Sequence, residues 1–232
     1  MPGLALFDLD NTLVDRLGAF AAWADRFVAS VGGGPADVAW LQETDADGQT
    51  PLDDLFEAVR RRWQLPESPE TLVAAYRETQ ADHYRPDPAI IGALQKLRDG
   101  GWGIAVVTNG APGQRRKIER AGLAGLVDVV CISAEVGSRK PDPAIFWEAC
   151  RQLTAVRVVA VGSSPEVHPP GRPVTVMIGD TPDADIGGAH ALGFTTVWLD
   201  RGRPWPDRPF RPDHVVSTVA GAVDVVLSLG GA

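Results

Sequence analysis

The sequence has few cysteines, few histidines and no long hydrophobic run. It contains two cysteines among 232 residues. Cys131 and Cys150 fall in a strand-like and a helix-like run, where buried free thiols are favoured over a disulfide, so we expect a cytoplasmic protein. The N-terminus lacks a basic segment, and no apolar stretch reaches about 18 residues. We therefore expect neither a secretion signal nor a transmembrane helix.

Positive charge is also scarce. A net charge of −8 gives no electrostatic footprint for nucleic acid or for an anionic membrane, so we expect neither as a partner. The four histidines are scattered without metal-ligand spacing. We expect a monomer or homodimer.

Two acidic residues near the N-terminus are the most informative feature that the sequence does contain. Asp8 and Asp10 follow the apolar run 4–7, which is typical of a strand buried on both faces. Carboxylates this close repel one another unless a cation, a proton or amide donors compensate them. The pair indicates a divalent metal site, or a nucleophile with an acid/base partner. Alternatively, residues 10–12 form a turn that caps a helix.

Three more polar clusters occur beside apolar runs further along the chain. The sequence Thr-Asn-Gly at 108–110 follows one run, Asp180 follows another, and Lys140 precedes a Pro-Asp-Pro sequence that starts a helix. Neighbouring parallel strands end at one edge of a sheet, so clusters far apart in sequence can meet there. We expect this convergence here.

The hydrophobic pattern divides the chain into two kinds of region. Residues 1–14 and 86–232 alternate short apolar runs with helical stretches, which predicts an α/β fold with a doubly wound parallel sheet, a Rossmann-like core. Residues 15–85 contain no convincing strand, so we expect a small helical cap domain inserted after the first strand. Apolar residues recur there at helical spacing over 18–31, 50–63 and 68–83.

Four segments together resemble the motifs of the haloacid dehalogenase superfamily. In chain order they read FDLDNTL, TNG, SRKPDP and IGDTPDAD. They resemble most the phosphatase-like branch with a helical cap after the first strand, as in phosphoglycolate phosphatase-like proteins. The resemblance covers most of the chain. It implies a magnesium-dependent phosphatase that hydrolyses a small phosphorylated metabolite through an aspartyl-phosphate.

The resemblance also implies a role for each matching residue. Asp8 attacks phosphorus, Asp10 protonates the leaving oxygen and then activates water, and Lys140 holds the nucleophile and the phosphate. The implied magnesium ligands are Asp8, the main-chain carbonyl of Asp10, and Asp180, with Asp185 as an indirect or water-mediated partner. The residues suited to phosphate oxygens and to close backbone approach are Thr108, Asn109 and Gly110.

Other roles and other reactions stay open at this point. Asp180 could cap the helix that follows it, Asp185 could interact with the helix dipole, and Lys140 could be a solvated surface residue. The segment 108–110 could serve only as a turn. A phosphomutase would return the phosphoryl group to a bound intermediate, and a haloacid dehalogenase would direct Asp8 at carbon. A further alternative is a non-catalytic protein that binds a ligand without converting it.

Selection among phosphate esters is expected to come from the helical insert, because the core residues serve features common to every ester. Arg16 lies at the entrance to the insert. Thr44 and Gln49 lie in the segment 43–49, which is expected to join two of its helices. These three residues are the candidate contacts to the substrate.

The chain departs from the family pattern between residues 154 and 173, where only a few residues normally join a helix to the fourth strand. Residues 156–161 form a short apolar run that could pair as an extra strand, inside a proline-containing insertion at 154–173. The segment 201–211 is rich in proline and arginine and is expected to be a solvated loop. Asp183 is expected to face solvent.

Overall fold

The computed structural model describes residues 2–161 and 173–230 of the chain, which divides into two compact units. One unit combines Met1–Val14 with Pro86–Ala232, and the other is Asp15–Arg85. We call them the core unit and the helical unit. Among the described residues, no helix is long and apolar enough to cross a lipid bilayer.

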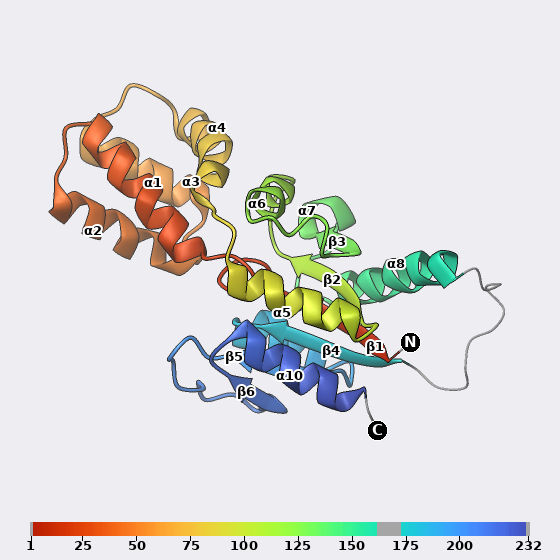
Figure 1. Cartoon of the computed structure of the whole chain (residues 1–232). Coiled ribbons are helices and arrows are strands. Elements are labelled where there is room, and N and C mark those ends of the chain that lie inside the picture. The colour runs from red at the N-terminus through yellow and green to blue at the C-terminus, as the bar shows by residue number, and fades with distance from the viewer. Residues whose placement is uncertain (1, 162–172, 231–232) are drawn as a thin grey trace. The chain divides into compact units, whose positions relative to one another are not determined.

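A six-stranded parallel sheet forms the centre of the core unit (Figure 1). In spatial order the strands are β3 (Val129–Ile132), β2 (Gly103–Thr108), β1 (Gly3–Phe7), β4 (Val174–Gly179), β5 (Thr195–Leu199) and β6 (His214–Val216). The order reverses between β1 and β4, which places the switch point of the sheet at the carboxyl ends of these two strands. The predicted doubly wound α/β fold is confirmed.

Helices cover both faces of the sheet because its central strands are apolar on both sides. Leu4 and Leu6 of β1 pack with Phe146 of α8 (Pro143–Val161). The alternate residues Ala5 and Phe7 point to the opposite face. In Figure 1, α5 (Pro88–Asp99) and α10 (Val219–Leu229) lie side by side on that face. The remaining helices of the unit are α6 (Gln114–Arg120), α7 (Ser133–Val136), the π-helical turn η3 (Pro182–Gly187) and α9 (Gly188–His190).

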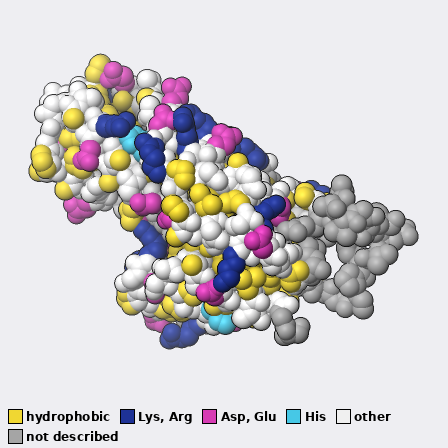
Figure 2. All heavy atoms as spheres, in the orientation of Figure 1, with side chains coloured by type: hydrophobic (Ala, Val, Ile, Leu, Met, Phe, Trp, Pro, Cys, Tyr) yellow, Lys and Arg dark blue, Asp and Glu magenta, His cyan; other side chains and the backbone are white. Residues whose placement is uncertain are grey.

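Charged side chains of both signs are interspersed on the face of the molecule that Figure 2 shows. An exposed ion pair joins α5 and α10, where Lys96 Nζ lies 2.7 Å from Asp224 Oδ1. Both side chains are more than half exposed, so this pair contributes little to stability. The buried ion pairs of the core unit, described below, differ from it because solvent does not screen them.

The helical unit is built around an aromatic core. Its elements are α1 (Arg16–Ser30), α2 (Pro35–Asp45), the 3-10 turn η1 (Ala46–Gly48), α3 (Leu52–Trp63), α4 (Pro69–Thr79) and the 3-10 turn η2 (Gln80–His83). Trp23 packs edge-on against Tyr76 with ring centroids 4.7 Å apart, and Phe20 and Phe56 complete the group. Such aromatic pairs add about 0.5–1.5 kcal/mol each beyond their buried area.

The helix α2 does not appear among the helices predicted from apolar spacing. It buries only Leu41 and Asp45, so it has no apolar stripe to detect. Local signals begin it instead, because Pro35 occupies its first turn and Asp37 Oδ2 accepts a hydrogen bond of 2.9 Å from the Gly34 amide. The predicted connecting segment 43–49 is accordingly shorter, since its first three residues belong to α2.

The prediction of an extra strand at 156–161 is wrong, because these residues form the last turns of α8. Their β-branched residues favour strand locally, but a helix that is already nucleated extends at little cost per residue. Asp142 nucleates it by accepting a 2.8 Å hydrogen bond from the Ala144 amide, ahead of Pro143 in the first turn. The rest of the insertion, 162–172, lies outside the described residues.

Candidate active site

The candidate site lies where β1 and β4 end side by side. Phe7 is opposite Ile178 in the sheet, and the amide of Asp8 donates a 2.9 Å hydrogen bond to the carbonyl of Ile178. Asp8 and Asp180 therefore leave adjacent strands at the same edge. This is the switch point of the parallel sheet, where ligands bind in open α/β folds.

Three aspartates form a buried cluster at this edge. Asp8, Asp180 and Asp185 each present an oxygen within 4.8 Å of the others, and all three are buried. Asp185 belongs to the turn η3, and its Oδ2 accepts a 2.9 Å hydrogen bond from the amide of Thr181. Thus Asp185 reaches back to the start of η3, whereas the side chain of Thr181 makes no capping bond there.

Lys140 lies between two of these carboxylates. Its Nζ is 2.6 Å from Asp8 Oδ1 and 2.7 Å from Asp185 Oδ1, and the residue is 3% exposed. Burial of an ammonium without partners would be costly, and here two opposite charges compensate it. The alternative of a solvated surface lysine is therefore contradicted.

Burial and charge act in opposite directions on the acid–base behaviour of the cluster. Burial raises the pKa of Asp8 to about 8; the Lys140 ammonium opposes the rise, and the other two carboxylates add to it. Burial by itself would lower the pKa of Lys140, but Asp185 and Asp8 together hold that pKa above its ordinary value. Burial, followed by Asp185, raises the pKa of Asp180. A further cation at the cluster would favour its ionised form.

Asn109 fixes the backbone of Lys140. Its Nδ2 donates to the Lys140 carbonyl at 3.0 Å, and its Oδ1 accepts from the Lys140 amide at 2.8 Å. The sequence-based interpretation gave Asn109 a direct contact to phosphate, but the structure engages both ends of this amide with Lys140. The neighbouring Gly110 amide donates to Ser133 Oγ at 3.0 Å, and the Thr108 hydroxyl accepts from Gln114 at 2.8 Å.

Asp10 contacts two side chains of α6. Lys117 Nζ lies 2.7 and 2.9 Å from its two carboxylate oxygens, and Gln114 Nε2 donates to Oδ2 at 2.8 Å. Gln114 and Lys117 are buried. Sequence reasoning missed both residues. The available signal was their spacing of three on one helix, which puts two polar side chains on the same face just after the segment 108–110.

The loop between β5 and β6 also reaches the cluster. Arg201 Nη1 lies 2.9 Å from Asp180 Oδ2, and Arg203 Nη2 lies 3.1 Å from the same oxygen. Most of the loop 201–211 is exposed, as predicted, but Arg201 is only partly exposed because the buried carboxylate of Asp180 attracts it. Asp183 is exposed as predicted, but Arg208 of the same loop pairs with it at 2.6 Å.

The three candidate substrate contacts of the helical unit lie in different environments within that unit. Arg16 forms a buried ion pair with Asp45, with Nη–Oδ distances of 2.5 and 2.6 Å. The Thr44 hydroxyl donates to the carbonyl of Trp40 at 2.7 Å. Gln49 is exposed. The guanidinium of Arg16 therefore holds the start of α1 to the end of α2.

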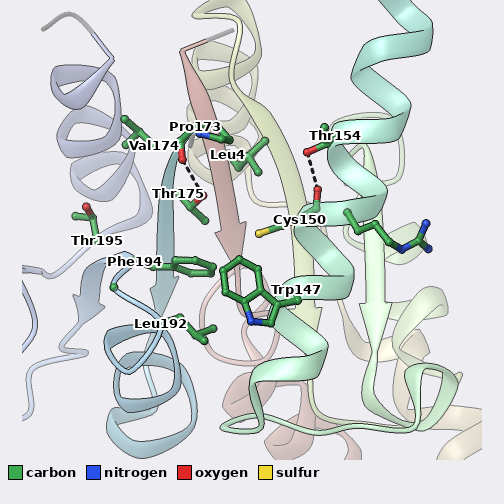
Figure 3. Close-up of a pocket in the computed structure, with 12 residues that line it drawn as sticks. Leu4, Trp147, Cys150, Thr154, Pro173, Val174, Thr175, Leu192, Phe194 and Thr195 are labelled. Atoms are coloured by element: carbon green, nitrogen blue, oxygen red, sulfur yellow. Dashed lines mark hydrogen bonds between the residues drawn. The ribbon is translucent and has the colours of Figure 1, made fainter. Parts of the chain in front are cut away.

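A cavity of about 600 Å³ in the core unit is separate from the candidate site. Figure 3 shows Trp147 and Phe194 facing one another in it, with ring centroids 5.3 Å apart. Leu4, Val174 and Thr195 line it as well. These three residues begin or adjoin the amino ends of β1, β4 and β5, so the cavity lies at the opposite edge of the sheet from the three aspartates.

Known proteins resemble this chain in both sequence and fold. It is 34% identical over 164 residues to the glyceraldehyde 3-phosphate phosphatase of Methanopyrus kandleri, and 36% identical over 159 residues to the phosphoserine phosphatase of Thermus thermophilus. These alignments cover 69% and 68% of this chain, but only 64% and 57% of the two relatives. The chain thus spans less than two thirds of the length of either.

A solved structure resembles the whole chain. The HAD-hydrolase YfnB of Bacillus subtilis, determined with bound magnesium, matches with a TM-score of 0.70 at 19% identity, over 97% of this chain and 98% of that one. At this identity the likeness concerns the fold. The family model of haloacid dehalogenase-like hydrolases matches residues 5–199, a range that includes Asp8, Lys140 and Asp180. This chain therefore belongs to the haloacid dehalogenase-like hydrolase family.

Proposed function

We propose that this protein is a magnesium-dependent phosphatase that hydrolyses a small phosphorylated metabolite through an aspartyl-phosphate on Asp8. One observation carries the proposal: Asp8, at the switch point of the sheet, is held by the buried Lys140 beside two further aspartates. The family supports the reaction class, since the two relatives named above are phosphatases of small phosphorylated compounds.

The donor set fits magnesium. Three carboxylates that approach within 4.8 Å provide hard oxygen ligands, which Mg²⁺ prefers. Asp8 and Asp180 would hold the ion together with the main-chain carbonyl of Asp10, and Asp185 would assist through water or through Lys140. The bound ion would supply positive charge to offset that of the phosphate and the crowded aspartates.

The chain's own residues would then act in two steps. In the first, a carboxylate oxygen of Asp8 attacks phosphorus, the bond to the ester oxygen breaks, and Asp10 gives that oxygen a proton. In the second, Asp10 takes a proton from a water molecule as this water attacks phosphorus, which releases phosphate and restores Asp8. Lys140 stabilises the ionised Asp8 that attack requires, and Lys117 and Gln114 orient Asp10.

We also propose that the helical unit, Asp15–Arg85, acts as a cap domain and selects the ester. The core residues named above serve the phosphoryl group, so discrimination requires groups that touch the alcohol. Of the three candidate residues in this unit, the exposed Gln49 is the best suited to contact the alcohol, because the side chain of Arg16 pairs with Asp45.

A screen of phosphate monoesters tests the reaction class. The wild-type protein, assayed with magnesium and again with excess chelator, should release inorganic phosphate from at least one metabolite only when magnesium is present. The variant Asp8→Asn should be inactive on that substrate, and Asp183→Asn, at an exposed position outside the cluster, should retain activity. Hydrolysis that persists in chelator, or in Asp8→Asn, would contradict the proposal. An isomerised ester without free phosphate would identify a mutase instead.

A further inference from the structure

We propose that Arg201 and Arg203 are built-in counter-cations of Asp180, which hold this carboxylate in the metal-free protein and compete with a divalent cation for it. The inference rests on the metal site of the proposed function. It assigns a role to two residues of the β5–β6 loop that none of the four sequence motifs contains.

Both arginines converge on one carboxylate oxygen. Arg201 Nη1 and Arg203 Nη2 lie 2.9 and 3.1 Å from Asp180 Oδ2, and Arg203 Nη2 also donates to the Asp180 carbonyl at 2.8 Å. The other oxygen, Oδ1, accepts a hydrogen bond of 3.3 Å from the hydroxyl of Thr181. Both oxygens of Asp180 are therefore already engaged by groups of this chain.

The charges explain why the contacts form. Asp8, Asp180 and Asp185 are buried together, and Lys140 pairs with only the first and the last of them. Asp180 obtains its compensation from the two guanidinium groups. With these, three carboxylates face three cationic side chains, and the cluster is neutral when all six are ionised. A divalent cation would add two positive charges beside guanidinium groups that already bind Asp180, its expected ligand. The arginines should therefore weaken binding of the cation.

The backbone of the loop has anchors other than the two arginine side chains. The main-chain amide of Arg203 donates a 2.9 Å hydrogen bond to the carbonyl of Asp200, and Trp205 packs edge-on against Trp198 with centroids 4.9 Å apart. The side chains of Arg201 and Arg203 are 18% and 42% exposed. Both are therefore more accessible to solvent than the side chain of Lys140, which is 2% exposed.

The test measures magnesium binding by calorimetry, without any substrate. The variants are Arg201→Gln, Arg203→Gln and the double variant, and the matched control is Arg208→Gln, from the same loop but paired with the exposed Asp183. Each single substitution should tighten magnesium binding by roughly tenfold, as expected for the loss of one charged hydrogen-bond contact. The double variant should bind more tightly still, and the control should bind as the wild type does.

Thermal denaturation supplies a second readout. In chelator, the double variant should melt below the wild type because Asp180 has lost its partners, and magnesium should raise its melting temperature by more than that of the wild type. Magnesium affinity that is unchanged or weaker in the double variant would overturn the inference, as would an equal gain in Arg208→Gln. Magnesium binding by the double variant but not by the wild type would support the inference. The absence of magnesium binding by both proteins would refute it. Because no turnover is measured, a failed ester screen leaves this result intact.

Discussion

Replacing Lys140 with methionine should destabilise the metal-free protein by about 3 to 5 kcal/mol, the usual cost of removing one partner from a buried ion pair. The change keeps most of the side-chain volume but leaves Asp8 and Asp185 facing one another. Their oxygens approach within 4.8 Å, so with an effective dielectric constant near 20 their repulsion is about 3 to 4 kcal/mol. The two figures agree. Protonation of Asp8, whose pKa burial raises, relieves part of this cost.

Urea denaturation at neutral pH in excess chelator measures the effect. The control is Lys96→Met, because Lys96 also pairs with an aspartate at 2.7 Å but is exposed, and its loss should cost less than about 1 kcal/mol. Adding Asp185→Asn to Lys140→Met removes one of the stranded charges, so the double variant should be more stable than Lys140→Met alone. If Lys140→Met cost no more than Lys96→Met, the argument that this lysine compensates buried carboxylates would be wrong.

Three further predictions concern other residues. Asp10→Asn should slow alkyl phosphates more than aryl phosphates, because a phenol leaves without full protonation, and equal losses in steady-state rate would argue against its role as an acid. Arg16→Met should leave Asp45 buried without its partner and speed hydrogen exchange across the helical unit; unchanged exchange with an altered substrate ranking would favour a contact to substrate instead. Burial raises the pKa of the Cys131 thiol to about 11, so at pH 8 this cysteine is protonated and should be alkylated only after unfolding, and rapid labelling of the native protein would contradict its burial.

The sheet could be predicted from the sequence because its strands are short apolar runs between polar residues. β5, for example, consists of the short apolar run Thr195–Leu199. The same pattern located Asp8 and Asp180, since a parallel sheet directs residues that follow adjacent strands to one edge. Lys140 could be placed because Asp142 and Pro143 fix the helix start immediately after it.

The parts that could not be predicted depend on tertiary contacts of charged residues. A lysine that pairs with a buried carboxylate and a lysine on the surface look alike in sequence, so the spacing of three between Gln114 and Lys117 indicates a shared helix face but does not show that this face is buried. Arg201 and Arg203 were assigned to solvent for the same reason, since only the fold brings their loop to Asp180. α2 escaped detection because Leu41 is the single apolar residue that it buries.

The central claim is that Asp8 carries the phosphoryl group during turnover. Acid quenching during hydrolysis of an aryl phosphate, followed by peptide mass spectrometry, measures this directly. The wild type is compared with Asp10→Asn, in which the second step should be slowed more than the first because a phenol leaves without full protonation. We predict that the peptide containing Asp8 gains the mass of one phosphoryl group, that it does so only with substrate and magnesium present, and that the modified fraction is larger in Asp10→Asn. Phosphate release at an undiminished rate by Asp8→Asn, or a phosphoryl group found on another residue, would contradict the account.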